Sequence, residues 1–249
     1  MVCVCCGSTE FVDRPILWQE LIDTWRLSAD EVAYINRQQG TACCRCESNM
    51  RSQALAAAMM DCAGYDGPFA AFVRTPTAQA LSVLEINTAG TLTPFLRQLA
   101  QHTLCVYPDA NMMALPYADA RFDMVVHSDT LEHVPDPVRG LRECARVLRP
   151  GGYCAFTVPI VIGRLTASRR GAPPSYHGAA TNPADCLVHT EYGVDAWTQV
   201  IAAGFRECRI RALEYPAALA LVGVTGGPER ALEMTAPKSR TAPVPRSSA

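Results

Sequence analysis

A regular alternation of apolar runs with helix-forming segments constrains the fold of this chain more than any other feature. From residue 81 onward, runs such as LSVLEI and FDMVVHS are almost continuously apolar, and amphipathic segments lie between them. Parallel strands are buried on both faces and need a crossover helix before the next strand, so they give this pattern. The sequence therefore predicts an α/β fold with a mostly parallel central sheet, whose ligand lies beyond the carboxyl ends of the strands.

The individual elements follow from the same pattern and from their capping residues. Helices are expected over residues 93–100, 136–148 and 194–204, where Asp136 is suited to cap the second of them. Residues 206–215 and 217–226 are expected to close the sheet as an antiparallel pair of strands. The parallel strands are expected over residues 81–86, 102–107, 122–128 and 153–159.

Two cysteine clusters near the start of the chain predict a metal site. Six of the twelve cysteines lie in the runs CVCC and CCRC, and each run holds a C-x-x-C pair. Two such pairs supply four thiolates to one tetrahedral ion, so a structural zinc is predicted on Cys3, Cys6, Cys43 and Cys46. Cys5 or Cys44 could replace a neighbour, and a redox or catalytic metal or unligated thiols are the alternatives.

The segment between the cysteine pairs is expected to hold two helices, over residues 15–25 and 28–40. Ser28 and Glu31 have capping-box spacing at the start of the second. A further helix over residues 48–64 carries an Ala/Met stripe suited to packing against the main domain, and turn residues follow it. We expect a zinc-stapled helical module over residues 1–66, an α/β domain over 67–225 and a disordered tail over 226–249.

Charge and hydropathy narrow the class of protein. The formal net charge is -2, with 22 basic and 24 acidic residues, so no broad positive field attracts nucleic acid. No apolar run is long enough to span a bilayer, and no secretory signal pattern opens the chain. The sequence favours a cytoplasmic protein that acts on a small molecule or a protein, without nucleic-acid or membrane partners. Its oligomeric state stays open.

Residues 115–159 carry three elements in fixed order, LPYADARFDMVV, EHVPDP and RVLRPGG. In order and spacing these resemble the central part of the UbiE-like, type 11 group of class I S-adenosylmethionine-dependent methyltransferases, and a looser resemblance extends over residues 81–224. It implies a Rossmann-like methyltransferase fold, S-adenosylmethionine across the strand ends, and in-line methyl transfer to a small-molecule acceptor. The accepting atom, oxygen, nitrogen or sulfur, stays undetermined.

The resemblance also implies where the cofactor lies. Positions carried over to this chain form three groups: the first cofactor loop, the adenosine side and the loop after the third strand. They are Glu85, Asn87 and Gly90; Asp109, Asn111 and Met112; and Ser128, Asp129 and Leu131. Gly90 would let the backbone approach the cofactor, since it lacks a Cβ. Glu85 could instead only cap a buried strand end.

Histidines supply the candidates for a general base. His133 lies in the EHV element, and His177 and His189 lie in an irregular segment after residue 159 that is typical of a binding loop. Glu191 and Tyr192 are further acceptor-site candidates, although the segment could be a plain surface loop. His127 is expected to be a satisfied core residue, and His102 has no chemical context in the sequence.

Two departures from the family pattern support another function. The first loop reads EINTAGT in place of an acid followed by G-x-G-x-G, and the segment before residue 115 is short. A catalytically degenerate methyltransferase fold, acting as a zinc-containing interaction or carrier-docking module, is therefore the alternative hypothesis.

Overall fold

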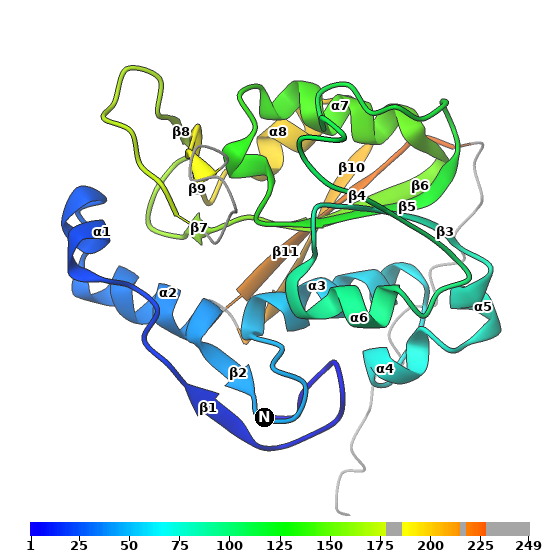
Figure 1. Ribbon diagram of the computed structural model, residues 1–249, viewed down its shortest axis with the longest axis horizontal. Helices are drawn as coiled ribbons and strands as arrows, with labels where there is room; N and C mark the ends of the chain where they lie inside the picture. The colour runs from blue at the N-terminus through cyan, green and yellow to red at the C-terminus, as the bar shows by residue number, and fades with distance from the viewer. Residues whose placement is uncertain (178–185, 215–217, 228–249) are drawn as a thin grey trace, which may run out of the picture.

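The computed structural model describes residues 1–177, 186–214 and 218–227, and a six-stranded sheet forms its centre (Figure 1). The strand order is β10-β11-β6-β5-β3-β4. Four strands are parallel and two close the sheet as an antiparallel pair, which confirms the predicted mostly parallel α/β fold. The strands are β3 (Ser82–Ile86), β4 (Gln101–Cys105), β5 (Phe122–Ser128), β6 (Leu148–Thr157), β10 (Glu207–Leu213) and β11 (Ala218–Val224).

The strand order creates a switch point beside β3. The chain passes from β3 outward to β4, and then returns across β3 to form β5 on its other side. The connections after β3 and β5 therefore leave the sheet on opposite faces and open a crevice at the carboxyl ends of these strands. Both connections contain a residue in the left-handed region, Asn87 at φ 54° and Asp129 at φ 46°.

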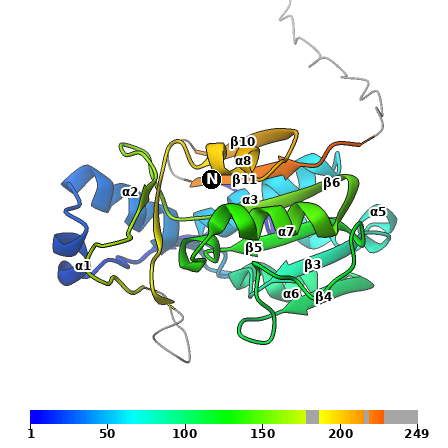
Figure 2. The same ribbon diagram turned by 90° about the horizontal axis from the view of Figure 1, so that it is seen from above.

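Helices cover both faces of the sheet (Figure 2). One layer holds α7 (Pro137–Val147) and α8 (Trp197–Ala202), and the opposite layer holds α3 (Met50–Cys62) and α6 (Thr93–Leu96). Asp136 caps α7 as predicted, since its side chain accepts a hydrogen bond from the Arg139 amide. Short helical elements complete the layers: α4 (Phe69–Phe72), α5 (Pro76–Gln79), η1 (Gly90–Leu92) and η2 (Leu131–His133).

The N-terminal segment extends from one end of the sheet. It holds α1 (Gln19–Thr24), α2 (Ala29–Gly40) and the antiparallel pair β1 (Phe11–Asp13) and β2 (Thr41–Cys43). The capping box of Ser28 and Glu31 is present as predicted. The first helix is shorter than expected, because the amides of Ile16 and Leu17 donate to the Asn36 side chain and hold this stretch outside the helix.

Helix α3 joins the N-terminal segment to the α/β layers. Ten of its thirteen residues are buried, and it packs against β6, β10 and β11, which confirms the predicted packing of the Ala/Met stripe. One continuous core includes Cys3 and Cys43 at one end and Val222 of β11 at the other. The cysteine clusters therefore share a hydrophobic core with the sheet, although the sequence placed α3 in a separate module.

The segment after β6 has more structure than the sequence predicted. It contains a three-stranded sheet of β7 (Ile160–Val161), β8 (Ala167–Ser168) and β9 (Thr190–Gly193). Gly193 fits closely here, since a Cβ at this position would lie 2.2 Å from the Arg164 carbonyl oxygen. The predicted tail falls, from residue 228 onward, outside the described residues.

Within the described part of the chain, no helix combines the length and apolar character that a membrane span requires.

Candidate active site

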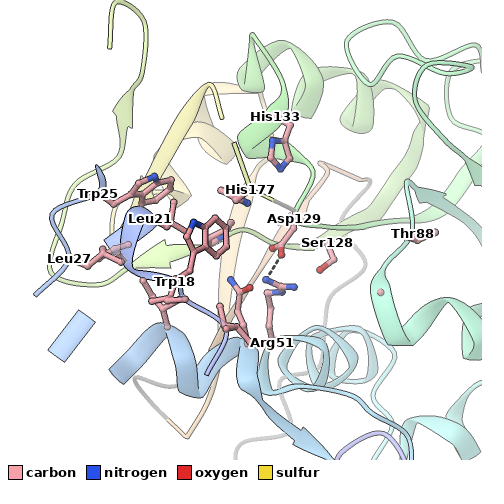
Figure 3. A pocket seen from close by; sticks show the side chains of 17 residues that line it. Trp18, Leu21, Trp25, Leu27, Arg51, Thr88, Ser128, Asp129, His133 and His177 are labelled. Carbon is pink, nitrogen blue, oxygen red and sulfur yellow. Dashed lines mark ion pairs between the residues drawn. The ribbon is translucent and has the colours of Figure 1, made fainter. Parts of the chain in front are cut away.

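A cavity of about 660 Å³ lies at the carboxyl ends of β3 and β5 (Figure 3). Thr88 and Gly90 after β3, and Ser128 and Asp129 at the end of β5, line it on the side of the sheet. Apolar side chains from the N-terminal segment line the opposite wall: Ile16, Leu17, Trp18, Leu21, Trp25, Leu27 and Ile35. The switch point of the sheet is thus one wall of a covered, mostly apolar cavity.

Glu85 fixes the loop after β3, whose residues Thr88 and Gly90 line the cavity. Its side chain is fully buried, and its Oε1 accepts hydrogen bonds from the Ala89 amide at 2.7 Å and the Thr93 hydroxyl at 2.5 Å. His102 on β4 lies 2.7 Å from Oε2. Burial raises the pKa of Glu85, but these hydrogen bonds outweigh it, so the pKa lies below its ordinary value. Glu85 therefore fixes the loop and does not line the cavity, and His102, which had no context in the sequence, is its partner.

An ion pair crosses the side of the cavity nearest the sheet. Arg51, from the first turn of α3, pairs with Asp129, and Figure 3 shows both side chains directed toward each other at the cavity. Within the described residues, Arg51 Nε and Asp129 Oδ1 are buried without a hydrogen-bond partner. The pair therefore contains one buried donor and one buried acceptor, on groups of opposite charge, that lack a hydrogen-bond partner.

Two histidines lie on the wall of the cavity beside this pair. The rings of His133 and His177 approach edge to face, with centroids 5.1 Å apart. Burial lowers the pKa of His133, and burial with the neighbouring His133 lowers the pKa of His177 to about 4. Both rings are therefore neutral near pH 7 and keep one unprotonated ring nitrogen, and the lowered pKa makes each a weaker base than a free imidazole.

His189, the third predicted base, does not line the cavity. Its backbone amide donates a hydrogen bond to the Glu132 carbonyl at 2.7 Å, which joins the residue before β9 to η2. Two acceptor-site candidates lie in the same segment. The Tyr192 side chain is buried and its hydroxyl donates a hydrogen bond to Gln199 Oε1, and the Glu191 carboxylate forms an ion pair with Arg169.

The predicted adenosine side lies outside the cavity. Asp109 and Asn111 are exposed on the connection after β4, while Met112 and Leu131 are buried in the core. Met112 packs against Gly140 of α7. Asn87 links the connection after β3 to the connection after β4, since its Oδ1 accepts a hydrogen bond from the Tyr107 amide at 3.0 Å. Gly90, Ser128 and Asp129 are thus the predicted cofactor residues that the structure brings to the cavity.

Two segments far apart in sequence, residues 16–35 and residues 159–177, contact each other at the cavity, and together they are called the cap. The Arg164 guanidinium forms a bidentate pair with Glu31, with N to O distances of 2.6 and 2.8 Å, and also donates to the Trp25 carbonyl. The Trp25 indole donates to the Ser175 hydroxyl at 2.8 Å and meets the His177 ring edge to face. Hydrogen bonds from Arg164 hold the pKa of Glu31 at about 2.

Replacing Arg164 by methionine is expected to loosen this cap. Trp25 is 9% exposed, whereas Trp18 and Trp197 are 49% and 44% exposed, so Trp25 is the indole protected from a quencher. Acrylamide should quench more of the tryptophan fluorescence in the variant, with a loss of stability of about 1 kcal/mol or less for a partly exposed pair. Because the pKa of Glu31 is depressed in the folded state, acid should reproduce the effect as pH falls from about 4.5 toward 2.

The matched control is Arg37→Met, which removes an exposed ion pair with Glu214 and leaves the Arg164 and Glu31 pair intact. Equal quenching in wild type and Arg164→Met would show that the pair does not hold the cap in place.

The four cysteines of the two C-x-x-C pairs lie together at the start of the chain. Their sulfur atoms all lie within 4.8 Å of one another, with 3.6 Å between Cys3 and Cys46 and between Cys6 and Cys43. Thiolates about 2.3 Å from a tetrahedral zinc lie about 3.8 Å apart, so the set fits this ion. Cys44 is exposed, and Cys5 is buried beside the set.

Sequence reasoning missed several residues of the cavity. Arg51 gave no signal because its partner Asp129 is distant in sequence. Trp18 and Trp25 lie within the segment predicted as a helix, residues 15–25, but a predicted helix does not reveal what its apolar side chains cover. His127 is buried as predicted and stacks on Phe156, but both ring nitrogens lack partners within the described residues, so it is not a satisfied core residue.

Comparisons with known proteins agree with this architecture. Residues 63–156 match the family model described as a methyltransferase domain. A demethylmenaquinone methyltransferase of Mycobacterium sp. (strain KMS) is 35% identical over 113 residues, covering 40% of this chain and 49% of that protein. A 27-O-demethylrifamycin SV methyltransferase of Amycolatopsis mediterranei is 50% identical over 51 residues, 20% of this chain and 19% of that protein.

The chain thus spans about half the length of the first of these relatives. Among solved structures, it is similar to a Burkholderia thailandensis 1,6-didemethyltoxoflavin-N1-methyltransferase, at 13% identity and a TM-score of 0.42 over 70% of this chain and 78% of that one. The open, mostly parallel sheet with a cavity at its switch point defines a Rossmann-like domain. The matched segment, residues 63–156, is similar to a methyltransferase domain, in agreement with the resemblance that the sequence predicted.

Proposed function

We propose that the protein is an S-adenosylmethionine-dependent methyltransferase acting on a small-molecule acceptor. The observation that carries this proposal is the Arg51 and Asp129 pair at the switch-point cavity. The amino-acid end of S-adenosylmethionine carries one carboxylate and one ammonium group, and the pair offers one partner of each charge. When bound, the cofactor supplies an activated methyl group on its sulfonium.

In this proposal the loops at the strand ends hold the cofactor. Gly90 has φ 57° and no Cβ, so its backbone allows close approach beside Thr88 and Ser128. The nucleoside would extend toward the connection after β4, where Asn87, Asp109 and Asn111 lie. Glu85 acts through the loop that it fixes, and Met112 and Leu131 support the wall from the core.

The cap determines the class of acceptor. Trp18, Leu21 and Trp25 present apolar and aromatic surface to the cavity, which favours a flat or apolar small molecule over a highly charged one. Holding the acceptor beside the methyl group is the main contribution the chain makes, since positioning can account for about 7–11 kcal/mol of a barrier. Neutral His133 or His177 accepts a proton where the acceptor atom carries one. His189, outside the lining, is the weakest of the three candidates.

We further propose that Cys3, Cys6, Cys43 and Cys46 bind one structural zinc. The sulfur separations fit tetrahedral coordination, and four thiolates leave no position for a substrate. The ion would join the turn at Cys3 to the turn at Cys43, beside the start of α3.

Calorimetry with S-adenosylmethionine tests the enzymatic proposal. We expect micromolar binding by the wild type, and binding weaker by about 10- to 100-fold in Arg51→Met and in Asp129→Asn, since each loses a charge-assisted hydrogen bond. Arg37→Met, which removes an exposed arginine pair elsewhere, should bind as the wild type does. A wild-type protein that binds no S-adenosylmethionine would favour the alternative, a degenerate domain acting as an interaction or carrier-docking module.

A further inference from the structure

Glu132 is a buried carboxyl group that has no hydrogen-bond partner in the part of the chain that the structure describes. Its side chain is 1% exposed, and within the described residues neither carboxylate oxygen has a hydrogen-bond partner. Its backbone is fixed, because its carbonyl accepts from the His189 amide at 2.7 Å. An unpaired buried carboxylate is costly, so this group is either protonated or neutralised by a bound cation, and its neighbours decide between the two.

The neighbouring histidines direct nitrogen atoms toward this carboxylate. His133 Nδ1 lies 3.1 Å from the Leu187 carbonyl oxygen. A carbonyl only accepts, so Nδ1 carries the proton and the neutral ring keeps its lone pair on Nε2. His133 Nε2 lies 3.8 Å from Glu132 Oε1. The hydrogen bond from Nδ1 to the Leu187 carbonyl thus holds the ring in the orientation that metal-ligating histidines usually have.

His177 completes a set of three. One ligand atom from each of Glu132, His133 and His177 lies within 4.8 Å of the others. Atoms bound to a divalent ion at about 2.0–2.2 Å lie about 3–4.4 Å apart, so a shift of less than about 1 Å brings the three to coordination distance. His177 comes from the segment after β6, and His133 from η2, so an ion here would link two elements that line the cavity.

We propose that Glu132, His133 and His177 form a second metal site, which binds a divalent transition ion such as zinc, iron(II) or cobalt(II) at the wall of the cavity. Two imidazoles and one carboxylate suit these ions and leave coordination positions open, unlike the four-cysteine set. Its role rests on the proposed function, and in the metal-bound protein His133 and His177 act as ligands in place of the general-base role given to them above. Because His133 and His177 line the cavity, an ion held by them would reach it, and there it would bind an oxygen or nitrogen atom of the acceptor as a Lewis acid and orient it.

Cobalt titration of the full chain tests this site. With the four-cysteine site loaded with zinc, Co²⁺ should bind once more per chain and give visible d–d absorption without a thiolate charge-transfer band. His177→Ala and the isosteric Glu132→Gln should each weaken cobalt binding by about 10-fold or more, since each removes a direct ligand. His189→Ala, a nearby histidine outside the set, should bind cobalt as the wild type does.

Two results would overturn the proposal: a zinc-loaded wild type that takes up no further cobalt, or cobalt binding that persists unchanged in Glu132→Gln. Circular dichroism of Glu132→Gln ensures that a loss of cobalt is not a loss of fold. Calorimetry with S-adenosylmethionine separates the two proposals. Cofactor binding without cobalt binding refutes only the metal site, and cobalt binding without cofactor binding refutes only the methyltransferase activity.

Discussion

Replacing Cys43 by serine is expected to release one zinc ion per chain and to destabilise the protein by several kcal/mol. Structural zinc binds small peptides with about 10–16 kcal/mol of apparent free energy, and part of this stabilises the fold. The loss should spread beyond the cysteine turns, because Cys3 and Cys43 are buried in the core that α3 shares with the sheet. Elemental analysis and the urea midpoint measure the two effects, and Cys3→Ser should behave in the same way.

The surplus cysteines provide matched controls for this experiment. Cys44 is exposed and lies outside the set of four, so Cys44→Ser should keep both zinc and the urea midpoint. Cys5 is buried, so Cys5→Ser should keep zinc but lose some packing energy. Zinc retained in Cys43→Ser and lost in Cys44→Ser would instead assign the ligand to Cys44.

Replacing Glu85 by alanine is expected to cost about 3–5 kcal/mol of stability, the usual loss when one partner of a buried ionic network is removed. The change leaves the Ala89 amide, the Thr93 hydroxyl and the His102 ring without their acceptor. The same loop carries Thr88 and Gly90 to the cavity, so binding of S-adenosylmethionine should weaken as well. Urea unfolding and calorimetry measure the two losses.

Glu85→Gln is the informative comparison, because the amide keeps one oxygen for the Ala89 and Thr93 donors. Its stability should fall between those of the wild type and Glu85→Ala. A Glu85→Ala protein as stable as the wild type would show that the loop does not depend on this carboxylate.

The sequence predicted the regular part of the fold well, because the signals there are local. A strand buried on both faces must be apolar along its length, so β3 and β5 were predicted within a residue of their observed bounds. Asp136 and the capping box at Ser28 announce helix starts through their own side chains. The spacing within each C-x-x-C pair likewise limits the metal chemistry before any fold is known.

The candidate site was predicted in part, because its side chains come from distant segments. The resemblance over residues 115–159 indicated the loop after β5, but not that Asp129 meets Arg51 of α3. The looser resemblance over residues 81–224 also implied cofactor positions at Met112 and Leu131, whereas both side chains are buried in the core. Whether a side chain faces a cavity or the core depends on the packing of neighbouring helices, which one segment of sequence does not specify.

The sequence by itself determined the class of fold, the type of its central strands and the chemistry available to the paired cysteines. Only the tertiary structure decided that the N-terminal segment lines the cavity at the end of the sheet, and that Arg164 holds this segment through an ion pair with Glu31. It also decided that Glu132 lies buried beside two histidines. The physical reason is the range of the interactions. Strand burial, capping and C-x-x-C spacing act within a few residues, whereas ion pairs, cavities and ligand sets depend on how distant elements pack.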